Sequence, residues 1–294
     1  MWAEDYIKLA AEDERWIIEP LLPSEGIINL YGKPKAGKSF AALGMAQAIS
    51  SGAPDWNGFP IHQHGPVLYV QVDTPRPEWA SRFITIKEVG GLDISNIGIV
   101  DMKMAPYPAN ILLPQHVAYM RAQYEAVKPV VVVVDTMREI HEADENNSTD
   151  MKRVMNGIIS AFRGAAIILV SHSRKDTAYN AMGADSDLMD EGRGSSYISG
   201  RMDTIIKFTG KKSKGFMHYK GRSAAENKVA IFQHPETGLV LVDDTSLKQE
   251  AEIKRMLGVD PKRATLSMAK ELVSMGLFVT TRTAERHIEK IRKV

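Results

Sequence analysis

The stretch Gly32–Ser39 constrains this chain more than any other, because its residues have the G-x-x-x-x-G-K-S spacing of a phosphate-binding loop. It lies between an apolar run over residues 26–31 and a helix-like run over residues 40–49. Glycines let successive backbone N–H groups curve around phosphate oxygens, and the following helix points the positive end of its dipole at the same anion. The strand, loop and helix together predict a nucleoside triphosphate site.

Two residues of this loop have predicted chemical roles. Lys38 is expected to reach the β- and γ-phosphates of ATP, and Ser39 is expected to hold Mg²⁺. The predicted nucleotide-binding set comprises Gly32, Lys33, Pro34, Lys35, Ala36, Gly37, Lys38, Ser39 and Phe40.

Composition and length are those of a globular protein. The 294 residues suit one large domain, or one domain with a small appendage. There are no cysteines, which excludes disulfides and thiolate metal sites. The N-terminus lacks the layout of a signal peptide, and no apolar run is long enough to span a bilayer. We therefore expect a soluble cytoplasmic protein without membrane contacts.

Two apolar strands are each followed by an acid. Residues 66–72 read as a buried strand ending at Asp73, and the β-branched run 130–134 reads as a strand buried on both faces that ends at Asp135. Ligands of parallel sheets lie at the carboxyl ends of the strands. Asp135 is the predicted second metal-site residue with Ser39, and Asp73 is the candidate that orients or deprotonates the attacking water, or alternatively caps the next helix.

A third apolar strand, residues 165–170, ends in polar residues that include His172. We predict that this strand neighbours the Asp135 strand, so that His172 senses the γ-phosphate, although a lone histidine in this position is usually structural.

Two loops are also predicted. The acidic residues 142–150 are expected to form a solvated loop before a helix over 151–162, and Ser148, Thr149 or Asp150 is expected to cap that helix. A long loop is expected over residues 176–194.

Residues 204–242 read as short strands, with a turn at 209–215. Six basic residues and no acid lie between positions 207 and 222, interleaved with Phe208, Phe216 and Tyr219. This pattern suits single-stranded nucleic acid and equally suits exposed lysines that keep strand edges soluble.

Residues 246–294 are expected to form a separate domain of small helices, after a nucleotide-binding domain over residues 1–245. The segment 247–294 has a formal charge of +5, against +1 for the whole chain. Its last helix places Ala284, Ile288 and Ile291 on one face and Arg282 and Arg286 elsewhere. That pattern fits a helix-turn-helix recognition helix or an ordinary helix packed on another subunit.

The order of these motifs resembles the RecA/DnaB superfamily, closest to the RepA-like hexameric helicase ATPases of plasmids and phages, over residues 14–245. The resemblance implies an α/β fold with a RecA-like core and a mainly parallel central sheet, to which the residues after 245 add a small C-terminal helical domain. It implies that Asp73 stands where the family has a catalytic glutamate, and that His172 is the sensor. It also implies that Lys220 and Arg222 enter the nucleotide site of a neighbouring subunit, and that the loop 176–196 faces a central channel.

The sequence therefore predicts a Mg²⁺-dependent DNA helicase that hydrolyses ATP and acts on single-stranded DNA during replication. It is expected to form a homo-oligomeric ring, and the resemblance implies a hexamer. The predicted catalytic set is Lys38, Asp73, Asp135, His172, Lys220 and Arg222. Three alternatives stay open: a recombination or repair ATPase that forms filaments, a DNA-binding regulator that uses ATP as an assembly switch, and a nucleotide-dependent protein adaptor.

Overall fold

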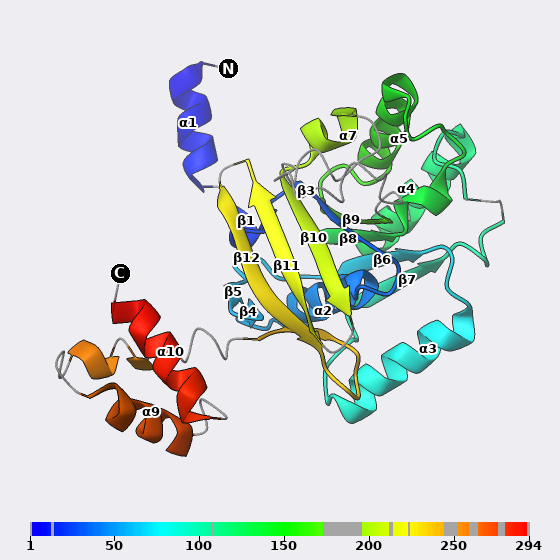
Figure 1. The fold of residues 1–294 in the computed structure, drawn as a ribbon. Helices are drawn as coiled ribbons and strands as arrows, with labels where there is room; N and C mark the ends of the chain where they lie inside the picture. The colour runs from blue at the N-terminus through cyan, green and yellow to red at the C-terminus, as the bar shows by residue number, and fades with distance from the viewer. Residues whose placement is uncertain are drawn as a thin grey trace. The chain divides into compact units, whose positions relative to one another are not determined.

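The computed structural model divides the chain into two compact units, Met1–Val242 and Asp243–Val294 (Figure 1). It describes residues 2–12, 15–106, 109–172, 196–211, 214–222, 224–243, 252–253, 255–258, 264–275 and 280–292. The predicted loop over residues 176–194 lies outside these ranges. Within them, no helix combines the length and the apolar character needed to cross a membrane.

One sheet of nine strands forms the centre of the first unit, in the order β13-β12-β11-β10-β3-β9-β8-β6-β7. Its parallel part runs from β10 to β7, and β11, β12 and β13 extend it as antiparallel strands. The strands are β3 (Ile27–Gly32), β6 (Val67–Gln71), β7 (Ile97–Asp101), β8 (Val131–Asp135), β9 (Ala166–His172), β10 (Thr204–Lys211), β11 (Lys214–Gly221), β12 (Ala224–Gln233) and β13 (Val240–Val242).

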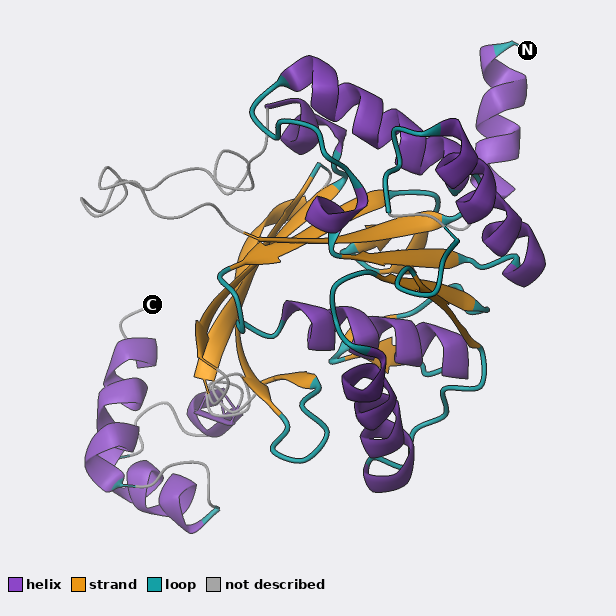
Figure 2. Ribbon diagram, turned by 90° about the vertical axis from the view of Figure 1, so that its right-hand side faces the viewer, coloured by secondary structure: helices purple, strands orange, loops and turns teal. Residues whose placement is uncertain are grey.

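Helices cover both faces of the parallel strands (Figure 2). The helices of this unit are α1 (Ala3–Glu12), α2 (Lys38–Ser51), α3 (Arg76–Ile84), the π-helical η1 (Thr85–Val89), α4 (Pro114–Val127), the 3-10 turn η2 (Met137–Ile140), α5 (Ser148–Ala161) and α7 (Ser196–Arg201). Two small hairpins complete it: β1 (Trp16–Ile18) with β2 (Leu22–Pro23), and β4 (Asp55–Trp56) with β5 (Phe59–Pro60). These features confirm the predicted α/β class.

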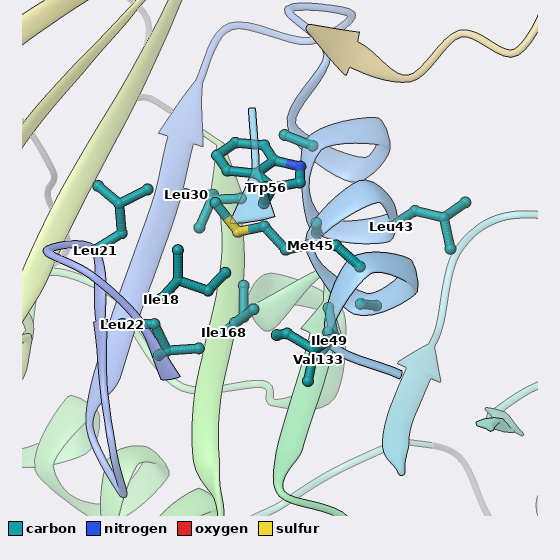
Figure 3. Close-up of a cluster of buried hydrophobic side chains, with 14 of the residues drawn as sticks. Ile18, Leu21, Leu22, Leu30, Leu43, Met45, Ile49, Trp56, Val133 and Ile168 are labelled. Carbon is teal, nitrogen blue, oxygen red and sulfur yellow. The ribbon is translucent and has the colours of Figure 1, made fainter. Parts of the chain in front are cut away.

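The two faces of the sheet bury separate apolar cores, because successive side chains of a strand point to opposite sides. In β8, Val131 and Val133 pack toward α2, whereas Val132 and Val134 pack in the core that contains residues of α4 and α5. Figure 3 shows the α2 side, where Met45 and Trp56 lie over Ile168 and Val133. A run of valines buried on both faces is what a central parallel strand requires.

The structure corrects two local expectations. Residues 209–211 continue β10 and β11 begins at Lys214, so the turn predicted at 209–215 is much shorter. Helix α5 is capped by Asn147 and not by the three residues that follow it, since its side chain accepts hydrogen bonds from the backbone of Thr149 and Asp150. An asparagine oxygen in this position satisfies N–H groups that lack partners within the helix.

The second unit has its own apolar core. Helices α9 (Thr265–Ser274) and α10 (Thr281–Arg292) pack together with residues from the segment 252–258. The buried residues are Ile253, Met256, Met268, Ala269, Leu272, Ala284 and Ile288. The predicted apolar face of the last helix is therefore correct, and Arg282 and Arg286 of the same helix lie outside this core.

Candidate functional site

The predicted phosphate-binding loop joins β3 to α2 at the carboxyl edge of the sheet. Gly37 precedes the helix with a φ of 95°, which favours glycine, and a side-chain carbon there would lie 3.1 Å from Nε2 of Gln233. Gly32 lies against β10, where an added side-chain carbon would be 2.3 Å from the carbonyl oxygen of Phe208. Both glycines therefore permit a close backbone approach. Lys33, Pro34 and Lys35 form the exposed tip of the loop.

Lys38 is buried at the base of this loop, and its ammonium group points back along the chain. Nζ donates hydrogen bonds of 2.9 Å to the carbonyl oxygens of Gly32 and Lys33. Burial lowers the pKa of Lys38 to about 8, and the negative charge of Asp135 opposes this change. The side chain therefore remains mainly a cation at pH 7, held inside the loop.

His172, the last residue of β9, brings a ring nitrogen to this cation. β9 pairs with β3 so that His172 lies opposite Gly32, and Nδ1 of its ring is 3.4 Å from Nζ of Lys38. An ammonium group can only donate, so Nδ1 is the acceptor and carries no proton. Burial and the charge of Lys38 lower the pKa of His172, which keeps the ring neutral.

Ser39 and Asp135 come together as predicted. The Ser39 hydroxyl donates to Oδ1 of Asp135 at 3.2 Å. The other carboxylate oxygen accepts a hydrogen bond of 2.8 Å from the phenol of Tyr69, which lies on the adjacent strand β6. Burial raises the pKa of Asp135, and the two hydroxyl donors oppose that rise. The arrangement is a buried carboxylate held by two neutral donors beside a helix N-terminus.

Asp73 lies at the predicted edge of the sheet, two residues beyond the end of the strand, and its negative charge acts on both Asp135 and His172. β6 ends at Gln71, the backbone N–H of Val72 still donates to the oxygen of Asp135, and Asp73 is the first exposed residue after the strand. The strand stops there because its neighbours also end: Gln71 pairs with Asp101 at the end of β7 and with Asp135 at the end of β8. The backbone oxygen of Asp73 accepts a 2.6 Å hydrogen bond from Lys103.

Lys220 and Arg222 lie at the opposite edge of the sheet from the loop. Lys220 in β11 pairs with Ile205, and the backbone of Arg222 donates to the oxygen of Asp203. Asp203 in turn accepts from the N–H of Ile27, the first residue of β3. β3 has six residues and spans about 16 Å, at roughly 3.3 Å per residue, so Arg222, beside its first residue, lies far from the loop at its end.

The Arg222 guanidinium is nevertheless held in place. It donates to the carbonyl oxygens of Gly200 at 2.6 Å and Met202 at 3.1 Å, and lies 3.6 Å from a carboxylate oxygen of Asp203. The side chain is 52% exposed. An anchored but accessible cation thus marks this edge of the unit.

Two residues beside the site were not predicted. Tyr69 lies in a strand that reads as wholly apolar, although a phenol among aliphatic residues usually has a hydrogen-bond partner when buried. Arg82 of α3 places its guanidinium 5.1 Å from the ring centres of both Phe40 and Trp79. It also forms an ion pair of 2.6 Å with Glu78. No local pattern in the sequence indicates this stacking, because Phe40 is 42 positions away from Arg82.

Comparison with known proteins agrees with this architecture. A family model described as an AAA domain matches residues 1–178. The chain belongs to this AAA_25 family. Among solved structures, one isolated ATPase domain is 14% identical, with a TM-score of 0.56, and the match covers 81% of this chain and 95% of that domain. No curated protein matches the chain.

A second solved structure, of a DnaB-like replicative helicase with its primase interactions, is 14% identical with a TM-score of 0.55. That match covers 81% of this chain and 65% of the helicase chain. At such low identity the likeness concerns the fold. Together with the family match, it places this AAA_25 protein in the RecA/DnaB superfamily, with a RecA-like ATPase fold.

Proposed function

We propose that this AAA_25 protein hydrolyses ATP in a homo-oligomer, a hexameric ring whose active sites are shared between subunits, and acts as a helicase on single-stranded DNA during replication. The observation that carries the proposal is the Ser39 hydroxyl hydrogen-bonded to the buried Asp135 carboxylate, with Lys38 in the same loop. Serine, lysine and a strand-end aspartate are the parts that P-loop enzymes use to place phosphates and metal.

The residues present fit Mg²⁺. Asp135 is a buried anion whose described partners are the neutral hydroxyls of Ser39 and Tyr69, and oxygen ligands are those that Mg²⁺ prefers. Ser39 and Asp135 would hold the ion, and the ion would neutralise charge on the phosphates when bound. In this proposal Tyr69 keeps the carboxylate oriented.

Three further residues would act on the phosphates and the attacking water. Lys38 would contact the β- and γ-phosphates, and the neutral His172, whose Nδ1 faces Nζ of Lys38, would respond when the terminal phosphate leaves. Asp73 would orient the water. Its exposure and its position in a turn, rather than a strand, leave its side chain free to move toward the loop.

Arg222 and Lys220 would complete the site of a neighbouring subunit. Their place at the edge opposite to the loop supports this, because a cation there cannot serve its own chain, whereas the carbonyls of Gly200 and Met202 preorganise Arg222. A positioned arginine stabilises the charge that develops during phosphoryl transfer. Such shared sites require a ring or filament.

The test is ATP turnover in the presence of Mg²⁺, with and without a single-stranded oligonucleotide. We expect DNA to raise turnover, and Lys38→Ala and Arg222→Ala each to lower it by about 100-fold or more. Lys87→Ala, a change at an exposed lysine of η1, is the control and should leave turnover unchanged.

Mixing the two inactive variants separates a shared site from a local one. An intact loop in an Arg222→Ala subunit would meet an intact Arg222 from a Lys38→Ala neighbour, so random mixing restores about a quarter of the sites. If mixing restores nothing while both variants still assemble, the shared site is disproved. If single-stranded DNA does not change the rate of ATP turnover, the proposed helicase activity is rejected.

A second candidate, a regulator that binds duplex DNA and uses ATP as a switch, is favoured by α10, which keeps Arg282 and Arg286 outside the core while burying Ala284 and Ile288. Site-specific duplex binding that persists in Lys38→Ala and is lost in a double Arg282→Ala, Arg286→Ala variant would select it. Absence of duplex binding would discard it.

A further inference from the structure

The antiparallel extension of the sheet has one buried and one open face. Phe208, Met217 and Tyr219 point into the core on the α2 side, so two of the three aromatic residues in this segment are unavailable to a ligand. In Figure 1 the strands β10, β11 and β12 face the viewer, and none of the labelled helices of this unit lies in front of them. Five of the residues that alternate with the core positions form what we call the basic face: Lys207, Lys214, Phe216, His218 and Lys228.

Three members of the basic face come from three different strands and form one row. Lys207 pairs with His218, and His218 pairs with Lys228. Adjacent strands are separated by about 4.8 Å, so the row is about 10 Å wide. Burial lowers the pKa of His218, and the positive charges of Lys228 and Lys207 lower it further. Cations on the same face of neighbouring strands reduce the stability of a sheet, and a polyanion would relieve this repulsion.

An aromatic ring lies in the next row. Phe216 is 37% exposed, and its ring lies 4.3 Å from Nζ of Lys228. The ring of His218 contacts it edge-on at 6.2 Å between centres. β10 and β11 contribute no carboxylate to this face, and β12 has Glu226 two positions before Lys228. Lysines alone would serve solubility, but an exposed ring among them also offers a surface for a flat, uncharged group.

We propose that the basic face binds a single strand of nucleic acid, with its lysines on the phosphates and Phe216 against a base. Single-strand binders combine a cationic track with aromatic side chains on which bases stack, and an open sheet face can serve as such a platform. The bases of a duplex are paired and stacked on one another, so a single strand is the form that can offer a base to Phe216. This goes beyond the proposed ATPase function, which does not say where on the protein single-stranded DNA binds.

The first experiment measures binding of a fluorescent dT20 oligonucleotide to the full chain by anisotropy, without nucleotide, over a range of salt concentrations. The double variant Lys214→Ala, Lys228→Ala should weaken binding about 10-fold or more and reduce the salt slope by about 1.4, since each phosphate contact contributes roughly 0.7. The control Lys87→Ala, Lys152→Ala removes the same charge from exposed positions in η1 and α5 and should change neither quantity.

The second experiment separates stacking from charge. Phe216→Ala should weaken binding of dT20 by about 5- to 150-fold, the range that corresponds to the loss of one stacked base. The same variant should leave the affinity for inorganic polyphosphate, which has charge but no bases, unchanged, and Phe216→Tyr should restore dT20 binding. Thermal unfolding of each variant verifies that the sheet is intact.

Several outcomes would overturn the proposal. Equal losses in the face and control variants would show that net charge alone binds DNA. If only the double variant Arg282→Ala, Arg286→Ala loses affinity for dT20, the oligonucleotide binds to the second unit and not to the basic face. Polyglutamate competing as well as dT20 would indicate an acidic protein partner. Because binding is measured without ATP, it can succeed when turnover fails and fail when turnover succeeds, so the two proposals are tested separately.

Discussion

Asp135 at the end of β8 and Asp73 beyond the end of β6 are carboxylates at the same edge of the sheet, in very different surroundings. Asp135 is 4% exposed and accepts hydrogen bonds from Ser39 and Tyr69. Asp73 is exposed, and its described side-chain partner is the neighbouring hydroxyl of Thr74 at 3.2 Å. Buried carboxylates need such donors, whereas exposed ones are satisfied by water.

The difference separates two tasks that one edge of a sheet can perform. A carboxylate that helps to hold a metal ion must stay in one orientation, and the fixed rows of β6, β8 and β9 supply that rigidity. A group that reaches a water molecule needs freedom to move as the substrate enters. The turn after β6 allows such movement, and Lys103 fixes only the backbone oxygen of Asp73.

Of the changes that test this comparison of the two carboxylates, Asp73→Asn is expected to have the largest effect. Loss of the base should lower ATP turnover by about 100-fold, within the range of general-base contributions, without weakening ATP binding. Asp73→Glu adds one methylene and should match or exceed the native rate, because the longer side chain reaches further from the exposed turn.

Turnover at saturating ATP and affinity for a fluorescent ATP analogue measure the two effects separately. Asp144→Asn, a change at a carboxylate in the loop before α5, is the matched control. If Asp73→Asn turns over ATP as fast as the native protein, the water is oriented by another group.

A smaller effect is expected from Tyr69→Phe, which removes the donor that distinguishes Asp135 from Asp73. The ring contact with Trp79, at 4.8 Å between centres, is retained, but Oδ2 of Asp135 loses its donor. The free energy of unfolding should fall by about 1–3 kcal/mol, and turnover by about 10-fold.

Denaturant unfolding measures the stability change, and Tyr219→Phe removes a phenol from the antiparallel part of the sheet as a control. Unchanged stability and turnover in Tyr69→Phe would mean that Ser39 alone orients the carboxylate.

The contrast also shows what sequence can predict. The loop, Lys38, Ser39 and Asp135 were predictable because they follow a fixed spacing or end a strand whose whole length is buried. The strand before Asp73 was predicted to run two residues too far, since the end of β6 is set by where β7 and β8 stop pairing. Tyr69 and Asp135 are 66 positions apart, and no local pattern signals a hydrogen bond over that separation. Alternation predicts two faces for β11, but only the sheet register shows which aromatic residue is exposed.

The smallest expected effect is on the pH dependence of stability, through His141. This residue is buried in the segment that follows β8. His141 follows η2 and is 4% exposed. Burial, with a contribution from the positive charge of Arg138, lowers its pKa from the ordinary value of 6.5. The folded state therefore holds the ring neutral, whereas the unfolded chain takes up a proton as pH falls below about 6.5.

Proton uptake by the unfolded chain favours unfolding, so the stability contribution of His141 is complete above pH 6.5 and is lost as pH falls toward the lowered pKa. We expect the urea midpoint to decrease less between about pH 7.5 and about pH 5.5 in His141→Leu than in the native protein. Some dependence should remain, because the pKa values of His172 and His218 are also lowered. His64→Leu, at a histidine outside the buried core, should retain the full native dependence. If the urea midpoint changes with pH equally in His141→Leu and His64→Leu, the folded protein does not keep His141 neutral. The region after β8 would then be as open to water as the turn that contains Asp73.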